Sequence, residues 1–173
     1  IKEMVSALAL LLKEISKGAS EKITLQEELE LVESYIYIQK IRCKGMFRVH
    51  YNIPDKTILD YKILKFTLQP IIENAIFHGL DLKKGIGNIK IEMNQAGDKI
   101  IISIEDDGVG MSIEKVNSIL SEDKEEELTE FNRIGIKNID ERIKLYYGHQ
   151  YGLKIESQVG KYTRVSIMIP KED

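Results

Sequence analysis

The pattern of apolar and polar positions predicts two amphipathic helices at the start of the chain. Apolar side chains recur every three or four positions in residues 1–17 and again in residues 25–44. Thr24 precedes Glu27 by three residues, a capping-box pattern typical of a helix start, and Gly45 marks the expected stop. A helical hairpin of this kind leaves apolar surface on one side. Either a partner or the rest of this chain must cover that surface.

After Gly45 the spacing of apolar residues changes from every three or four positions, as in helices, to every second position, as in strands. We place a domain boundary there. Alternating residues predict strands over 46–53, 89–93, 100–104, 151–157 and 163–169. Helices are expected over 67–79, over 112–120 behind Ser112 as N-cap, and from about Gly135 to Gly148. The fold class is therefore α+β: a helical hairpin over residues 1–45 precedes strands and helices over residues 46–173.

The helix predicted for residues 67–79 has an unusual polar side. At about 100° per residue, apolar side chains fill one face of this helix, whereas Gln69, Glu73, Asn74 and His78 fall on the other. Aromatic residues interleave with these polar groups. A surface that mixes rings with a carboxylate, an amide and an imidazole suits the wall of a pocket better than bulk water. We therefore expect this helix to line a ligand site.

Composition and charge narrow the classes of function. The chain has 173 residues, of which 43% are hydrophobic and 31% charged, as expected for one globular domain with an appendage. The net charge of -3 provides no basic field for nucleic acid, so no nucleic-acid partner is expected. The single Cys43 excludes an internal disulfide and a multi-cysteine metal site. The apolar run over residues 7–12 is too short to cross a bilayer, so we expect no direct membrane contact from these residues.

Three short motifs contain the turn residues that a ligand site requires. Residues 106–110, Asp-Asp-Gly-Val-Gly, follow a predicted strand, and their glycines allow a close approach of backbone to ligand. Residues 133–138 open a predicted helix with a glycine, where backbone amides can meet an anion. Residues 160–163 form a hairpin turn. Taken singly, each also fits an ordinary turn or helix start. A calcium loop is a poor match, because Ser103 and Glu105 occupy positions that need Asp or Asn.

Together and in this order, these motifs resemble the N, G1 and G2 boxes of the GHKL ATP-binding family. That family joins histidine kinases, type II topoisomerases, MutL and a heat-shock chaperone. The resemblance is greatest to sensor histidine kinases of the LytS-like group, and it covers nearly the whole chain. The N box is similar to Leu68-Gln69-Pro70-Ile71-Ile72-Glu73-Asn74-Ala75 followed by His78-Gly79. The helix before it is similar to Thr24–Arg42, including Tyr35, Gln39 and Arg42.

The resemblance implies a two-layer α/β sandwich with a mixed sheet layered on helices over residues 46–173. It also implies that ATP and Mg²⁺ are bound, with a role for each matching residue. Asn74 would hold Mg²⁺ between phosphate oxygens, and Glu73 would polarise an attacking group. Asp106 would accept a hydrogen bond from the adenine amino group, with Gly108 and Gly110 letting the chain curl past the base. Gly135, Ile136, Lys137 and Asn138 would meet the phosphates, His78 and Thr163 would support the pocket, and residues 112–132 would form a lid.

Three residues depart from the family pattern. Phe77 stands where these kinases often have a lysine near the phosphates, and Tyr162 replaces a glycine of the last turn. Arg133 replaces the first glycine of the G2 box, where it would either reach the phosphates or stiffen the lid. These departures leave open a non-catalytic nucleotide-binding regulatory dimer. A hydrolytic GHKL ATPase is a third alternative, disfavoured because Pro70 lies one turn before Asn74, where hydrolytic relatives have a catalytic glutamate.

The resemblance further implies a protein-histidine kinase of a two-component system, but the histidines are poorly placed. His50 lies on a predicted strand, His78 in the nucleotide helix and His149 in a turn, so the acceptor is expected upstream of Ile1. The hairpin would then be the remnant of the dimerisation and phosphotransfer region, forming a homodimer through helices 1–17 and 25–44. The implied partner is a response regulator, and the implied location is the cytoplasmic portion of a membrane-anchored bacterial sensor.

Overall fold

The computed structural model describes residues 2–16, 21–80, 85–120 and 130–172. Its centre is a five-stranded sheet in the order β2-β4-β5-β7-β6. The strands are β2 (Phe47–Asn52), β4 (Gly87–Ala96), β5 (Lys99–Asp106), β6 (Gly152–Gln158) and β7 (Tyr162–Pro170). β2 runs parallel to β4 and the other neighbours are antiparallel, so the sheet is mixed, as predicted.

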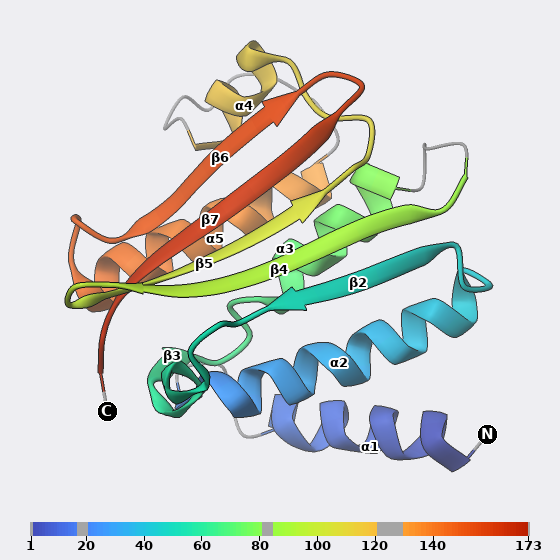
Figure 1. Ribbon diagram of the computed structural model, residues 1–173, viewed down its shortest axis with the longest axis horizontal. Coiled ribbons are helices and arrows are strands. Elements are labelled where there is room, and N and C mark those ends of the chain that lie inside the picture. The colour runs from blue at the N-terminus through green and yellow to red at the C-terminus, as the bar shows by residue number, and fades with distance from the viewer. Residues whose placement is uncertain (1, 17–20, 81–84, 121–129, 173) are drawn as a thin grey trace.

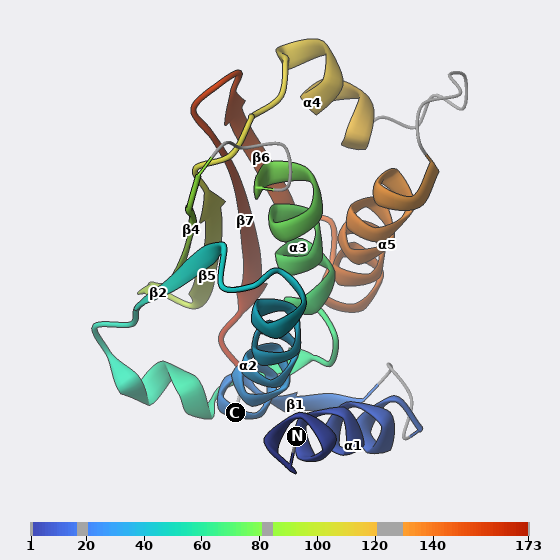
Figure 2. The ribbon, with the colours of Figure 1, turned by 90° about the vertical axis from the view of Figure 1, so that its right-hand side faces the viewer.

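The helices lie on one side of this sheet (Figures 1 and 2). They are α1 (Lys2–Ser16), α2 (Leu25–Arg42), α3 (Gln69–Asn74) with its π-helical continuation η2 (Ala75–Leu80), α4 (Ile113–Leu120) and α5 (Glu130–Tyr147). The side-on view of Figure 2 places α3 and α5 against the sheet and α1 beyond α2. Among the residues described, no helix combines the length and the apolar character that a bilayer span needs. The predicted α+β class is confirmed.

The end signals of the second helix are confirmed, whereas the start predicted for the last helix is wrong. The Thr24 hydroxyl accepts the Glu27 amide at 3.1 Å, and the Glu27 carboxylate accepts the Thr24 amide at 2.8 Å. Gly45 lies at φ +73°, as a helix stop requires. α5 begins at Glu130, five residues before Gly135. A glycine inside a helix costs only about 1 kcal/mol relative to alanine, so Gly135 does not break this helix.

Three short elements have no counterpart in the predictions. β1 (Lys22–Thr24) pairs with β3 (Lys62–Leu64), and a 3₁₀ helix, η1, covers Lys56–Asp60. Strands of three residues are too short to show an alternating pattern. The β1–β3 ladder joins the predicted helical hairpin to the segment that leads into α3.

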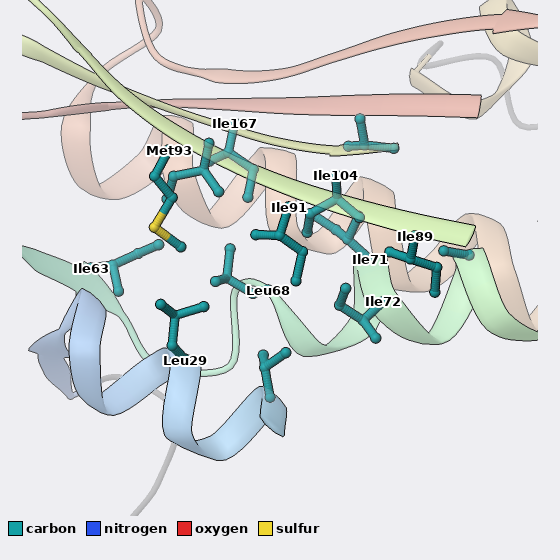
Figure 3. Packing of buried hydrophobic residues seen from close by; sticks show 14 of the residues in the cluster. Leu29, Ile63, Leu68, Ile71, Ile72, Ile89, Ile91, Met93, Ile104 and Ile167 are labelled. Atoms are coloured by element: carbon teal, nitrogen blue, oxygen red, sulfur yellow. The ribbon is translucent and has the colours of Figure 1, made fainter. Parts of the chain in front are cut away.

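The core lies between the sheet and its helices (Figure 3). The inner-facing residues of β4 are Ile89, Ile91 and Met93, all fully buried. Ile71 and Ile72 of α3 pack against this face, and Leu29 of α2 belongs to the same cluster. α2 is therefore covered by this chain. The boundary proposed at Gly45 divides two segments that share one core, and it stays a prediction.

α1 packs on α2 but keeps apolar residues at the surface. Val5, Leu8 and Leu12 expose between 50% and 59% of their area. An open groove of about 850 Å³ runs between the two helices, with Ala7 and Leu10 on one side and Tyr37 on the other. The outer side of the predicted hairpin thus retains uncovered apolar surface of the kind that its pattern implied.

Candidate functional site

Asp106 lies at the end of β5 with 4% of its area exposed. The neighbouring strands place Ile89 and Thr163 opposite it. Its Oδ1 atom accepts the Gly108 amide at 3.0 Å. Burial, together with the nearby charges of Asp107 and Glu105, raises the pKa of Asp106 from 3.8 to about 7, although the Gly108 amide lowers it. Asp106 is thus a buried acceptor whose ionised form would gain from a further hydrogen-bond donor.

Gly79 and Gly108 bring the end of η2 into contact with the turn after β5. A Cβ atom on Gly79 would lie 2.2 Å from Asp106 Oδ1, and one on Gly108 would lie 2.0 Å from the Gly79 carbonyl oxygen. The Val109 amide donates to that same carbonyl at 3.0 Å. Neither position has room for a side chain. The absence of side chains at Gly79 and Gly108 therefore allows Asp106 to pack directly against η2.

The same turn is also fixed to the β6–β7 hairpin. Gly110 lies at φ +64°, and a Cβ atom there would stand 2.0 Å from the Gln158 carbonyl oxygen. The Met111 amide donates to Ser157 Oγ at 2.8 Å, and this hydroxyl lies 3.0 Å from Thr163 Oγ1. The structure thus brings Asp106, the two predicted glycines and Thr163 together.

Ser157 is a residue of this cluster that the sequence did not single out. Its hydroxyl donates to the Tyr162 carbonyl at 2.8 Å. Tyr162, the residue that replaces a family glycine, therefore contributes its backbone here. Only the β6–β7 register, which pairs Ser157 with Thr163, reveals this role.

Glu73 and Asn74 end α3 with half-buried side chains. The Asn74 amide nitrogen donates to the Pro70 carbonyl at 2.7 Å. The Glu73 carboxylate accepts Gln69 Nε2 at 3.1 Å. Burial and the nearby Glu73 charge raise the pKa of Tyr35 on α2. Both polar side chains are thus held in place by neighbours. The side chain of His78 lies outside the described part of the structure.

The first half of α5 lies beside the start of α3. A Cβ atom on Gly135 would be 3.9 Å from the Pro70 Cβ atom, and Ile136 is buried. Lys137 lies 3.8 Å from Glu141, and Asn138 is exposed. Because the helix starts at Glu130, residues 135–138 do not form the helix N-terminus that the sequence suggested. The side chain of Arg133 and lid residues 121–129 lie outside what is described.

Comparison with known proteins assigns this arrangement to a family. Residues 60–173 match the model for histidine kinase-, DNA gyrase B- and HSP90-like ATPases, and residues 1–47 match a histidine kinase model. The chain belongs to this ATPase family. The predicted resemblance to sensor histidine kinases of the LytS-like group is confirmed.

Relatives of this chain include three named sensor proteins. It is 36% identical to sensor histidine kinase YesM of Bacillus subtilis and 28% identical to sensor histidine kinase BtsS of Escherichia coli, over 98% and 99% of this chain. Identity to sensor protein LytS of Staphylococcus saprophyticus is 28% over 98% of the chain. In each case the chain spans 28% of the relative's length.

Solved structures share the GHKL fold. The catalytic domain of histidine kinase ThkA superposes with a TM-score of 0.63 at 16% identity, covering 88% of this chain and 97% of that domain. The histidine kinase domain of a blue-light activated kinase from Erythrobacter litoralis superposes with a TM-score of 0.61 at 18% identity, covering 98% of this chain and 74% of the other.

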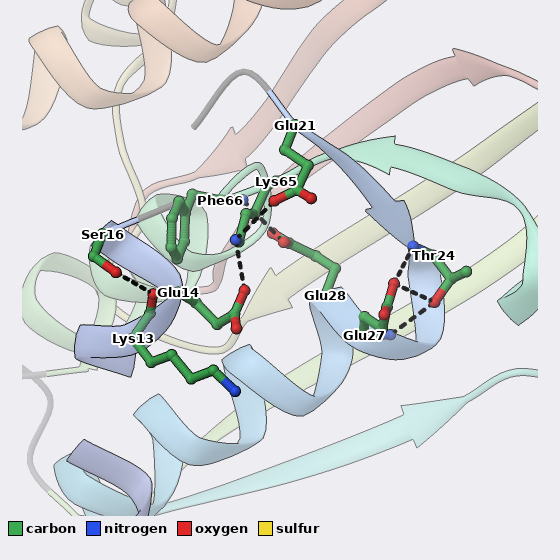
Figure 4. Close-up of polar contacts among 9 residues, drawn as sticks. All are labelled: Lys13, Glu14, Ser16, Glu21, Thr24, Glu27, Glu28, Lys65 and Phe66. Carbon is green, nitrogen blue, oxygen red and sulfur yellow. Dashed lines mark hydrogen bonds and ion pairs between the residues drawn. The ribbon is translucent and has the colours of Figure 1, made fainter. Parts of the chain in front are cut away.

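The turn before the N-box helix of this GHKL chain is held by buried charges that sequence reasoning missed (Figure 4). Glu28 of α2 is 1% exposed and accepts the amides of Phe66 and Leu68, each at 2.9 Å. Burial raises the pKa of Glu28, whereas these two hydrogen bonds lower it. Phe66 lies at φ +57°, a left-handed conformation that is rare for an aromatic residue. Glu28 therefore stabilises a strained turn at the start of the N box.

Helices on both sides support the same turn. Lys65 is fully buried, and its Nζ atom lies 2.6 Å from the Glu14 carboxylate of α1. Arg142 of α5 donates to the Thr67 hydroxyl at 2.9 Å. Residues from α1, α2 and α5 thus meet at four consecutive positions, 65–68. No local sequence pattern predicts this cluster, because charged residues ordinarily lie at the protein surface.

Proposed function

We propose that this chain binds Mg²⁺·ATP and forms the ATP-binding catalytic part of a sensor histidine kinase. The kinase would transfer the γ-phosphoryl group to a histidine in a two-component signalling system. The observation that carries this proposal is the buried acceptor Asp106 within a cradle of three glycines. Family membership and the sensor relatives support it.

The donor set fits an adenine ring. An exocyclic amino group donates hydrogen bonds, and the Asp106 carboxylate accepts them. Gly108 and Gly110 let the η2 segment and the β6–β7 hairpin pack directly against the turn that follows this carboxylate, which fixes its position. Thr163 on the neighbouring strand β7 pairs with Asp106 and places a hydroxyl next to the Asp106 side chain. These residues would orient the base and thereby select adenine.

The groups on α3 suit a hard cation held mainly by phosphate. No cluster of three or more histidine, cysteine or acidic side chains capable of holding a metal occurs in the residues described. Asn74 would contribute an amide oxygen to Mg²⁺, and such ions keep most of their ligands as phosphate oxygens and water. When bound, Mg²⁺·ATP supplies the phosphoryl group and its charge neutralisation. Glu73, held by Gln69 and close to Tyr35, would orient the attacking group.

The acceptor and the partners belong to the same proposal. Among the histidines, His50 lies on β2, His78 in η2 and His149 in the turn after α5, so we place the acceptor outside these 173 residues. A structure of ThkA in complex with response regulator TrrA aligns with 96% of this chain at a TM-score of 0.62. We propose a response regulator as the partner here and a homodimer through α1 and α2. The location would be the cytoplasmic side of a membrane-anchored sensor.

Calorimetric titration with ADP and Mg²⁺ tests the nucleotide site. Binding is expected for the native chain, and Asp106→Asn is expected to abolish it because the amide presents an N–H group to the adenine amino group. The matched control is Asp98→Asn in the exposed β4–β5 turn, which should bind normally. Absence of heat with the native chain would refute the site. Binding that survives Asp106→Asn would refute the assigned base contact.

Incubation with γ-labelled ATP separates the kinase from its rivals. The isolated chain is expected to acquire no acid-labile phosphate and to release no phosphate over many turnovers. Labelling of the chain itself would contradict an acceptor outside these residues, and sustained phosphate release would favour a hydrolytic ATPase. The alternative of a regulatory module is motivated by Phe77, Arg133 and Tyr162. It would be supported if the full-length kinase bound nucleotide but transferred no γ-phosphoryl group to a histidine.

A further inference from the structure

The last three turns of α2 present one polar face to the N-box helix. Tyr35, Gln39 and Arg42 are spaced by four and three residues, so they share one side of α2. Glu73 and Phe77 are four apart and share one side of α3 and η2. Burial and the Glu73 charge raise the pKa of Tyr35, and the Arg42 guanidinium carbon lies 4.2 Å from the Phe77 ring centre. Two helices therefore meet through two matched pairs.

Arg42 shares its side of α2 with two buried neighbours. Tyr35 is 8% exposed and Gln39 is 9% exposed. Burial and the nearby Glu73 charge raise the pKa of Tyr35, so this side of α2 faces the N-box helix. Arg42, on the same side of α2, lies over the Phe77 ring. Within the part of the chain that the structure describes, the exposed Arg42 forms no ion pair, so its charge is not neutralised by a protein carboxylate.

Phe77 adjoins the residues assigned to the phosphate side of the site. It follows Asn74 by three positions and Glu73 by four, and residues at these spacings are neighbours on a helix surface. The ring that carries the guanidinium group therefore lies on the same side of this helix as both residues. Stacking leaves the five N–H donors of arginine, which lie in the guanidinium plane, free to point outward, and this fork matches phosphate oxygens.

We infer that Arg42, carried on the Phe77 ring, is the cationic residue that binds the phosphates of the nucleotide. The α2 helix thereby supplies the charge that the N-box helix lacks at position 77. This inference rests on the proposed ATP site. In this inference Phe77, which stands where related kinases often have a lysine, still contributes to phosphate binding, because its ring orients a cation from a different helix.

Calorimetry with ATP, ADP and adenosine, each with Mg²⁺, tests the inference. Arg42→Ala is expected to weaken ATP and ADP binding roughly tenfold, as loss of a charge-assisted contact does. Adenosine binding should stay within about twofold of the native value, because adenosine has no phosphate. Lys40→Ala is the matched control: it removes a cation two residues away, on the other side of α2, and should bind all three ligands normally.

A rescue variant distinguishes charge placement from packing. In the Arg42→Ala background, Phe77→Lys should restore most of the ATP affinity, because it returns a cation to the N-box helix. ATP binding by Arg42→Ala at native affinity, or an equal loss for ATP and adenosine, would overturn the inference and leave the proposed function standing. Failure of the rescue in a folded double variant would also overturn it. If the native chain binds none of the three ligands, the proposed function itself fails.

Discussion

Lys65 Nζ and Glu14 Oε2 lie 2.6 Å apart and form a buried ion pair between the turn before the N box and α1. Glu21 makes a second, longer contact with Lys65 at 3.4 Å. Lys65 belongs to the segment that leads into the N-box helix, whereas Glu14 belongs to the outermost helix. The pair therefore links α1 to the start of the proposed nucleotide site, so a movement of α1 would also move that segment.

Removing one partner of this pair should destabilise the chain strongly. Glu14→Gln leaves the buried Lys65 ammonium with only the longer contact to Glu21, so we expect the free energy of unfolding to fall by about 3 kcal/mol. Urea denaturation followed by circular dichroism measures this change. Glu21→Gln is the control, because the Glu21 side chain is 52% exposed and should cost less than about 1 kcal/mol.

The double variant Lys65→Met with Glu14→Leu should recover most of that loss. Replacing a buried ion pair by apolar groups of similar size is often neutral, since neither charge must then be desolvated. A Glu14→Gln variant with the same free energy of unfolding as the native chain would show that the ion pair does not stabilise the fold.

The sheet and the first glycine turn could be predicted because their signals are local. β5 alternates buried and half-buried positions over its whole length, and Asp106 is its last residue. β4 has buried residues at every second position from Gly87 to Met93. The start of α5 could not be placed, because a single glycine reads as a helix start while tertiary packing tolerates it inside the helix. The Ser157–Thr163 contact depends on strand register, which no single segment encodes.

The buried charges of the turn over residues 65–68 were beyond sequence reasoning for a different physical reason. Glu28 and Lys65 look like surface residues, since an isolated charge is rarely buried. Each is stabilised by groups far away in the chain: Glu28 by amides 38 and 40 residues later, and Lys65 by a carboxylate 51 residues earlier. Only the folded chain supplies the compensation that makes their burial possible.

Asp106→Asn should stabilise the ligand-free chain at alkaline pH. The folded-state pKa of about 7 exceeds the ordinary 3.8, so the stability linked to this group is fully present below about pH 4 and is lost as pH rises through 7. The loss approaches roughly 4 kcal/mol above pH 7. Urea denaturation should therefore show Asp106→Asn gaining on the order of 2–4 kcal/mol relative to the native chain between pH 4 and pH 8. A constant difference across this range would contradict the shifted pKa.

The same carboxyl should make adenosine binding pH-dependent. An amino donor binds the ionised Asp106, so proton loss must accompany or precede binding. With a pKa of about 7, affinity should be about tenfold higher at pH 8 than at pH 6. Adenosine is the proper ligand for this test, because it has no phosphate that titrates in the range. Titrations in buffers of different ionisation enthalpy should detect proton release near pH 7, and equal affinities at the two pH values would exclude Asp106 as the acceptor.

Alanine substitutions at two glycines should have opposite effects. At Gly79 a Cβ atom would stand 2.2 Å from Asp106 Oδ1, so Gly79→Ala must displace either the carboxylate or η2, and we expect a loss of about 2 kcal/mol or more. At Gly135 the Cβ atom would meet only Pro70 at 3.9 Å, in the interior of α5. Gly135→Ala should therefore stabilise the chain by about 0.5–1 kcal/mol, because alanine loses less backbone entropy in a helix. Thermal and urea unfolding of both variants measure these changes. If Gly135→Ala destabilised the chain, α5 would not be helical at that position, and a helix beginning near Gly135 would again be the better description of the G2 box.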